Sequence, residues 1–333
     1  MAKNKYVPTN TSKRRDFDIS INPATTYAGE QALPYVTAAV KSNDTIAKGF
    51  VRTMDGLTSK AVISSLVTTD PIVAAACAFN DAGTTTLGER VLTVTDLKVN
   101  REVCRKTLYP TWVGKNMTQN GGLPQSFEDF LLEVVAGQAS AQIENGIWVA
   151  DANNIMGAGF LSDDGVFDQL GLNASACADF TQVTMNAGAA IDAANIDTAL
   201  SAVYDSVVAN HPGLEFKQGF GFYMNNKTFS FYQQYLAGVG AGQGVNLASL
   251  TLDSQTRYFG YPIYRCPGMP DDAIVATYTD NLVVGSNLGT DMNEATLIPT
   301  YQYDGSDNIR VVMNFGLGVQ SGIGTDGVVG CIF

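Results

Sequence analysis

The chain has 333 residues, of which 45% are hydrophobic and 16% charged, and its formal net charge is −12 at pH 7. This length allows a large core divided between about two subdomains, and the low share of charged residues favours burial in an assembly, although large enzymes can share it. The N-terminal sequence has no apolar signal-peptide core and no run of 18 apolar residues occurs, so we expect neither secretion nor a membrane span.

The charge is distributed unevenly along the chain. Residues 1–115 hold 15 Lys and Arg against 10 Asp and Glu, whereas residues 116–333 hold 5 against 22. A basic N-terminal segment and an acidic body favour contact with each other, within one chain or between neighbours. A basic tail that is only solvated is the alternative. The five cysteines show no CxxC spacing, and we interpret them as mostly buried and reduced.

The N-terminal part of the chain predicts an arm followed by short elements. Residues 1–28 are polar and rich in Lys and Arg, and they lack the apolar surface that would offset their own ordering entropy, so we expect an arm. Glu30–Val40 predicts a short helix. The segments FVRTM and KAVISSLV predict short strands on either side of the turn dipeptide Asp55-Gly56.

Residues 72–79 (IVAAACAF) and 90–99 (RVLTVTDLKV) flank a segment rich in Gly, Asn, Asp and Thr. This arrangement predicts a long β-hairpin. An isolated two-stranded ribbon is marginally stable in water, so we expect a partner to cover this hairpin.

The stretch 126–151 (SFEDFLLEVVAGQASAQIENGIWVAD) predicts one long helix without Lys or Arg. Ser126 and Asp129 resemble a capping box at its start. About 24 residues at ~1.5 Å each would span roughly 36 Å. The apolar residues repeat with helical spacing and predict one buried face, formed by Phe127, Phe130, Leu131, Val134, Val135, Ala139, Ile143 and Ile147.

The C-terminal half mixes helices with strands. Residues 192–210 predict an amphipathic helix that ends at His211-Pro212-Gly213, with Ile196, Leu200, Val203, Val207 and Val208 facing inward. FGFYMN predicts a strand, NKTFSFYQQYLA a helix opened by Asn225 or Asn226, and GVGAGQGVN a mobile loop. Four later segments predict strands: YFGYPIYRCP, DAIVATYTDNLVVGS, EATLIPTYQY and NIRVVMNFGLGVQSGI, the last two joined by a turn at 304–307. This order predicts an α+β fold.

No catalytic constellation is evident in the sequence. His211 is the single histidine and, at a predicted helix end, is expected to be a capping or surface residue. No His/Cys cluster suits zinc or iron, and no GxSxG motif is present. The alternating glycines at 238–244 match neither a dinucleotide nor a P-loop motif. We therefore assign no catalytic, metal or cofactor-binding residue, and keep a carboxylate-based hydrolase built from dispersed residues as the alternative.

The order of these parts resembles the major capsid proteins of tailed double-stranded DNA phages, which have the Hong Kong 97 fold. The resemblance covers the whole chain and rests on order, without one diagnostic motif. It implies an N-terminal arm at 1–28, a short helix and strands of a peripheral domain at 29–69, an E-loop hairpin at 70–98, the peripheral domain with a long spine helix at 99–151, an axial domain with linking segments at 152–290, and return strands of the peripheral domain at 291–333.

The resemblance implies hexamers and pentamers that close into an icosahedral shell around packaged DNA, in a virion assembled in the host cytoplasm. Its implied partners are other copies of the chain, a separate scaffolding protein, a portal and decoration proteins. A built-in scaffold has no room in a 28-residue arm. DNA contact is expected to be weak and non-specific, because only the basic arm offers a cationic run. An encapsulin-like shell around protein cargo is the alternative within the same fold.

The resemblance also implies which residues would meet neighbouring subunits. The arm would use Lys13, Arg14 and Arg15, and the E-loop would use Asp81, Gly83, Glu89 and Arg90. The acidic residues of the spine helix, Glu128, Asp129, Glu133 and Glu144, would receive a neighbour's basic arm. The loop that contains Gly238, Gly240, Gly242 and Gly244 would approach the axis of the capsomer.

Overall fold

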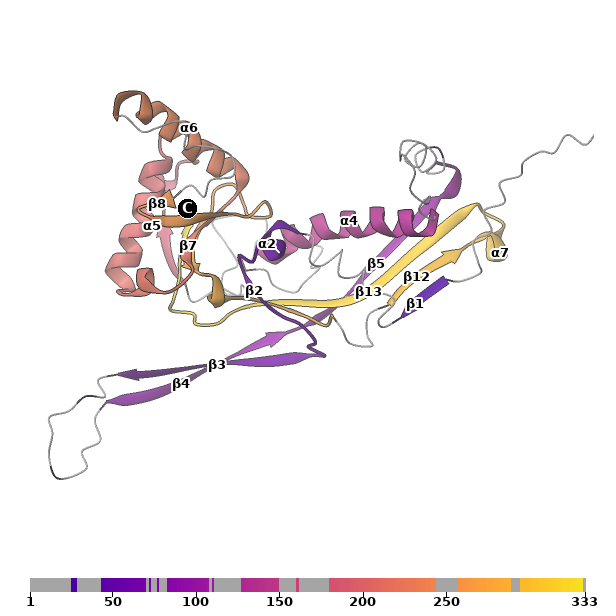
Figure 1. The fold of residues 1–333 in the computed structure, drawn as a ribbon, viewed down its shortest axis with the longest axis horizontal. Coiled ribbons are helices and arrows are strands. Elements are labelled where there is room, and N and C mark those ends of the chain that lie inside the picture. The colour runs from indigo at the N-terminus through magenta and orange to yellow at the C-terminus, as the bar shows by residue number, and fades with distance from the viewer. Residues whose placement is uncertain are drawn as a thin grey trace, which may run out of the picture.

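The computed structural model places two six-stranded sheets along one elongated molecule, with a separate two-stranded ribbon projecting from it (Figure 1). The described residues are 25–28, 43–69, 72, 77, 83–107, 110, 127–149, 160–161, 180–243, 257–288 and 294–331. The predicted helix Glu30–Val40 lies outside them, as do Lys13, Arg14, Arg15, Asp81, Gly244 and the side chain of Glu128.

The first sheet packs one face against the long helix α4 (Phe127–Trp148). Its strand order is β1-β12-β13-β11-β2, with β5 paired to β13 as well. The strands are β1 (Thr25–Ala28), β2 (Arg52–Met54), β5 (Thr95–Cys104), β11 (Leu282–Ser286), β12 (Glu294–Pro299) and β13 (Asn308–Ser321). Alternate residues of β13 point to α4 and are buried with it: Ile309, Val311, Met313, Phe315, Leu317 and Val319.

Helix α4 confirms the long helix that the periodicity predicts. Seven of the eight residues predicted to face inward are buried, and Val134 is half-buried. The helix is therefore amphipathic in the predicted sense, and its apolar side covers the sheet. The predicted hairpin of β12 and β13 is also confirmed, with the one-turn helix α7 (Tyr301–Asp304) and Gly305, whose φ is 69°, in the connection.

The second sheet has the order β6-β14-β10-β7-β9-β8 and a core of its own. Its strands are β6 (Thr181–Thr184), β7 (Phe220–Met224), β8 (Arg257–Tyr258), β9 (Tyr261–Arg265), β10 (Ile274–Tyr278) and β14 (Val328–Cys331). Helices α5 (Ile196–Asn210) and α6 (Asn226–Gln243) accompany it, and short turns complete the part that the structure describes: α2 (Asp44–Ala47), η4 (Asn186–Gly188), η5 (Leu214–Phe216) and η7 (Thr279–Asn281).

The ends of the two predicted helices are confirmed. Helix α5 stops at Asn210, and His211 is its C-terminal cap, with Nε2 2.7 Å from the hydroxyl of Thr181. Helix α6 begins at Asn226, and the side chain of Asn225 accepts a hydrogen bond of 3.2 Å from the backbone N–H of Lys227. One inward prediction is wrong, because Val208 is 49% exposed.

The predicted glycine-rich loop is wrong for residues 238–243, which are helical. Helix α6 continues through Gly238, Gly240 and Gly242 to Gln243. A Cβ placed on Gly238 would meet no atom within 4 Å, so space does not require a glycine there. Once a helix is nucleated, each further residue adds a backbone hydrogen bond at little cost, which lets α6 run through residues of poor propensity.

The predicted E-loop hairpin is wrong in its strands. Strand β4 (Thr84–Thr93) pairs with β3 (Lys60–Thr69), whereas the prediction pairs residues 90–99 with residues 72–79, most of which lie outside the described residues. Residues 95–104, which the prediction divides between the hairpin and the peripheral domain, form β5 and pair with β13. Strands β3 and β4 carry large side chains at alternate positions, whereas the alanine-rich segment 72–79 offers few side chains for cross-strand pairs.

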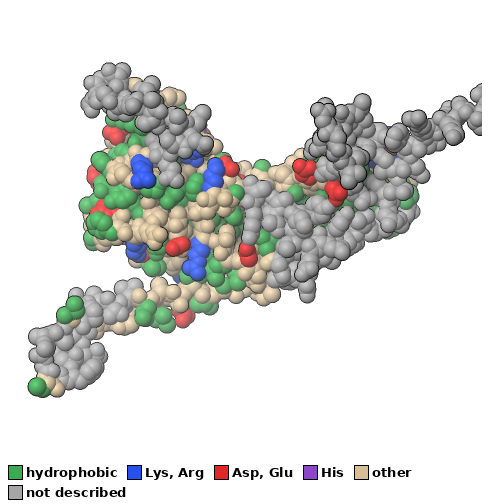
Figure 2. Space-filling model, in the orientation of Figure 1, with side chains coloured by type: hydrophobic (Ala, Val, Ile, Leu, Met, Phe, Trp, Pro, Cys, Tyr) green, Lys and Arg blue, Asp and Glu red, His purple; other side chains and the backbone are tan. Residues whose placement is uncertain are grey.

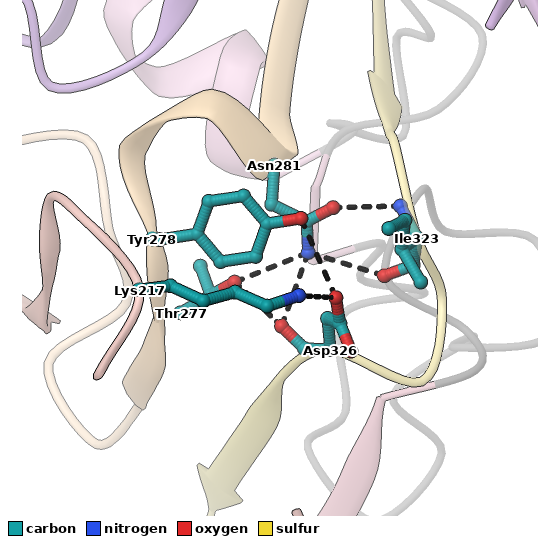
Figure 3. Close-up of polar contacts among 6 residues, drawn as sticks. All are labelled: Lys217, Thr277, Tyr278, Asn281, Ile323 and Asp326. Carbon is teal, nitrogen blue, oxygen red and sulfur yellow. Dashed lines mark hydrogen bonds and ion pairs between the residues drawn. The ribbon is translucent and has the colours of Figure 1, made fainter. Parts of the chain in front are cut away.

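A buried asparagine joins the two sheets. The chain passes from β10 to β11 through η7, and returns from β13 to β14 through residues 322–327. Asn281, 1% exposed, accepts a hydrogen bond of 2.6 Å from the N–H of Ile323 and donates to the carbonyls of Ile323 and Asp326 at 3.1 Å each (Figure 3). Lys217 forms an ion pair with Asp326 beside the ring of Tyr278. Both crossings are therefore tied together at one point.

Candidate assembly surface

The ribbon of β3 and β4 presents an apolar face to solvent. Its register places Val62 opposite Val91 and Leu66 opposite Leu87. Because side chains alternate along a strand, these four share one face of the ribbon. They are 60%, 49%, 68% and 59% exposed, in that order. Figure 2 shows hydrophobic side chains along the ribbon where it stands away from the body.

The base of the ribbon is attached to the first sheet. Leu92 is fully buried, and a Cβ placed on Gly285 of β11 would overlap it, so the two segments are in close contact. Arg90 donates a hydrogen bond of 2.9 Å to the hydroxyl of Ser321. The N–H of Leu57, just before the ribbon, donates to the carbonyl of Ser286 at 3.0 Å. The ribbon is thus held at its base and exposed beyond it.

The residues predicted for contacts of the E-loop lie on different faces of the ribbon. Glu89 is exposed and lies on the apolar face, between Leu87 and Val91. Gly83 is exposed and has a φ of 85° at the start of β4. Arg90 points to the other face, is half-buried and donates a hydrogen bond to Ser321 of its own chain; its contact with a neighbour stays a prediction. The role of Glu89 and Gly83 in contacts between subunits stays a prediction.

The prediction for Glu144 as an exposed acceptor of a basic arm is wrong. Its carboxylate is 6% exposed and accepts hydrogen bonds from the N–H of Thr45 at 3.1 Å, from the Thr45 hydroxyl, and from the N–H of Gly268 at 3.4 Å. Glu144 therefore links α4 to α2 and to the loop after β9. On the same helix Glu133 is exposed and Asp129 half-buried, and their contact with an arm stays a prediction.

The surroundings of Glu144 form a buried, closely packed junction. Trp148 is fully buried, donates a hydrogen bond of 3.2 Å to the Thr45 hydroxyl, and packs on Phe160 and Tyr223. Burial raises the pKa of the Cys266 thiol well above its usual range, as desolvation disfavours the thiolate. Such a thiol packs as a small apolar residue. The cysteine prediction is confirmed for Cys266 and Cys331, both buried, and wrong for Cys77, which is exposed.

Within the described ranges, no group of three or more His, Cys, Asp and Glu residues could hold a metal ion. In that part of the chain no helix is both long enough and apolar enough to cross a membrane. The candidate functional feature is a surface, the exposed apolar face of a ribbon whose base is attached to a body of two sheets.

Solved structures share this arrangement over nearly the whole chain. A chain of the satellite phage P4 procapsid is 13% identical and has a TM-score of 0.56, with 90% of each chain covered. A chain of the capsid of Myoviridae phage XM1 is 12% identical and has a TM-score of 0.54, with 87% of this chain and 92% of that chain covered. The chain has the Hong Kong 97 fold. A chain of the capsid of a native GTA particle is 15% identical and has a TM-score of 0.52, with 89% of this chain and 90% of that chain covered.

No protein-family model and no curated protein matches the sequence. At identities of 12–15% the structural likeness establishes the fold alone. We call the first sheet with α4 the peripheral domain, the second sheet with α5 and α6 the axial domain, and the ribbon of β3 and β4 the E-loop ribbon. Strand β11 lies in the first sheet and β14 in the second, so the predicted bounds 152–290 and 291–333 do not coincide with the sheets. The predicted α+β fold is confirmed.

Proposed function

We propose that the chain is the major capsid protein of a tailed phage, assembling as hexamers and pentamers into an icosahedral shell around double-stranded DNA. The observation that carries this proposal is the E-loop ribbon. Its apolar face of Val62, Leu66, Leu87 and Val91 is exposed in the single chain, although a two-stranded ribbon needs a covering layer for stability.

A neighbouring copy of the chain is the occupant that fits this face best. Repeated copies in a closed shell make every contact many times, so a modest apolar contact accumulates into a stable assembly. Burying the four aliphatic side chains would contribute roughly 1.5 kcal/mol or more for each one fully covered. The solved structures with the same fold support this choice, since they are the capsid of a GTA particle, the capsid of phage XM1 and the P4 procapsid.

The remaining parts of the proposal follow from the shell. The basic arm with Lys13, Arg14 and Arg15 would lie on an acidic neighbour or meet DNA without sequence preference. A separate scaffolding protein, a portal and decoration proteins would assist assembly in the host cytoplasm, and the product would be part of a virion. The P4 procapsid structure includes a size determination protein, an accessory partner of that relative. The role proposed here is structural, without catalysis.

Substitutions on the two faces of the ribbon test the proposal. Leu66→Asp places a charge on the apolar face, and Thr86→Asp places one on the opposite face of the paired strand. Both positions are exposed, so both subunits should fold with unchanged circular dichroism. We expect negative-stain microscopy to show shells for the wild type and for Thr86→Asp, and few or none for Leu66→Asp.

Two results would contradict the proposal. Normal shells from Leu66→Asp would remove the role of the ribbon face. A discrete monomer or dimer of the wild type under all assembly conditions, including co-expression with a scaffolding protein, would remove the shell itself. No described residue favours a cargo-enclosing shell or a hydrolase over a phage capsid.

A further inference from the structure

An aromatic patch lies on the surface of the axial domain. The ring of Phe259 stacks on Tyr204 of α5 with centroids 5.0 Å apart, and Tyr204 is 6.2 Å from Tyr261. Two further exposed apolar side chains are close in sequence to residues of this cluster. Val208 follows Tyr204 by one helical turn, and Phe216 follows Glu215, whose carboxylate accepts a hydrogen bond of 3.3 Å from the Tyr204 hydroxyl. Phe216, Phe259 and Val208 are 81%, 66% and 49% exposed.

The backbone at Phe259 is strained to present its ring. Phe259 and Gly260 form the two-residue turn between β8 and β9, with φ values of 46° and 87°. Such a turn favours Asn-Gly, because a bulky residue at positive φ brings its Cβ against the backbone. The strain costs on the order of 1 kcal/mol or more. Phe259 contacts the rings of Tyr204 and Tyr258 in its own chain, yet its side chain stays 66% exposed. A strained aromatic residue with most of its surface in solvent indicates a contact surface.

The size of the patch indicates that it is one part of a larger contact. At ~150–250 Å² for an aromatic side chain, the exposed fractions of Phe216 and Phe259 present about 300 Å² of apolar surface. A stable protein interface buries roughly 800 Å² on each partner. The patch alone would therefore be too small, and a second surface is needed beside it.

The E-loop ribbon provides that second surface. In Figure 1 the ribbon extends toward the same end of the molecule as α5 and β8, which carry Tyr204, Val208 and the turn at Phe259. A subunit placed to cover the ribbon would therefore lie against this end of the axial domain as well. Exposed Asp205 and half-buried Glu215 adjoin the patch and would form the polar rim that surrounds an apolar interface centre.

We propose that Tyr204, Val208, Phe216, Phe259 and Tyr261 form an inter-subunit contact with a second copy of this chain, the same neighbour that covers the E-loop ribbon. This inference rests on the proposed shell function. It assigns the centre of a contact between adjacent axial domains to residues whose local structure is otherwise unfavourable. Aromatic side chains are enriched in such centres because they bury large area at low entropic cost.

Substitution of Phe259 separates the contact from the fold. Phe259→Asn relieves the strain of the turn but removes the ring contacts with Tyr204 and Tyr258, so the urea midpoint of the isolated subunit should change little. The same change removes the ring, and we expect the concentration needed for half-assembly to rise by about tenfold or more. Phe259→Tyr keeps the ring and should assemble like the wild type. Val208→Glu, at an exposed helix position, should fold normally and impair assembly as well.

Chemical labelling tests the location directly. In a Cys77→Ser, Val208→Cys chain, maleimide should modify position 208 in free subunits and at least about tenfold more slowly in assembled shells, as burial removes access. Equal rates in both would overturn the inference, and so would wild-type assembly of Phe259→Asn and Val208→Glu. If the wild type forms shells while the patch stays reactive, only this inference fails. If the wild type never assembles, the proposed function fails with it.

Discussion

Replacing Asn281 by alanine should destabilise the junction between the two sheets. The side chain is 1% exposed, and its Oδ1 accepts a hydrogen bond from the N–H of Ile323. Its two N–H groups are shared among three acceptors, each 3.1 Å from Nδ2: Thr277 Oγ1 and the carbonyls of Ile323 and Asp326. Both crossings between the sheets depend on this one amide. We expect the effect to be large for a single polar residue.

The magnitude follows from which groups lose their last partner. The carbonyl of Ile323 keeps the N–H of Asp326, and the carbonyl of Asp326 keeps the hydroxyl of Thr277. The N–H of Ile323 is left without its Asn281 acceptor, which costs roughly 1–3 kcal/mol in a buried site. The lost donated bonds add about 1 kcal/mol between them after exchange with their remaining partners. We therefore expect a loss of about 3 kcal/mol in the free energy of unfolding.

Urea denaturation of the isolated subunit measures this loss. The Leu66→Asp background keeps the subunit from assembling, so that oligomerisation does not contribute to the measured stability. The urea midpoint should fall while the m-value stays constant. Asn210→Ala is the matched control, since Asn210 is exposed and its side chain donates only to Ser206 at 3.1 Å. Its expected loss is below about 0.5 kcal/mol. A loss below 1 kcal/mol for Asn281→Ala would refute the reasoning.

Three further predictions concern the spine helix and the tyrosines. Glu144→Ala leaves the N–H groups of Thr45 and Gly268 unpaired in a buried junction, and should cost about 2–4 kcal/mol in urea denaturation; Glu144→Gln keeps an acceptor and should recover part of this, and an equal loss would contradict the account. Gly268→Ala places a Cβ against the carbonyl of Glu144 and should cost about 1–3 kcal/mol. Its control Gly137→Ala, which meets nothing within 4 Å on α4, should stabilise by about 0.5–1 kcal/mol; the opposite order would refute the packing. Burial, then neighbouring groups that include the Asp197 carboxylate, raises the pKa of Tyr232 and Tyr258 to about 12. Because both phenols keep their protons to a higher pH in the folded than in the unfolded chain, their contribution to stability should be constant below pH 10. It should fall between pH 10 and 12, by up to about 1.4 kcal/mol per pH unit for each tyrosine. Tyr258→Phe should make this fall shallower, and an unchanged fall would exclude Tyr258 as a source.

Periodicity in the sequence determined the elements whose buried face is local. Helix α4 repeats its apolar residues every three or four positions, and the buried side of the helix is the predicted one. Strand β13 and the end of α5 at Asn210 could also be predicted from the sequence. The alternation of apolar residues along a strand and a His-Pro-Gly segment after a helix are both properties of a few adjacent residues. The order of these elements was sufficient to predict the α+β fold of the capsid type.

Tertiary structure alone decided which segments meet. Strand β4 had two possible partners upstream. Its pairing with β3 depends on the matched register of side chains 15 (Thr69 and Thr84) to 33 (Lys60 and Thr93) residues apart, which no local pattern reports. The sequence predicts Glu144 as one of several acidic residues on the surface of the helix. In the structure Thr45 of α2 and Gly268, both distant in sequence, bind its carboxylate in a buried site. The sequence predicts Phe259 as a strand residue, whereas the pairing of β8 with β9 places it in a turn. In each case contacts that are distant in sequence overrode the local preference, and these are the places where the proposed assembly contacts and the junctions of the fold lie.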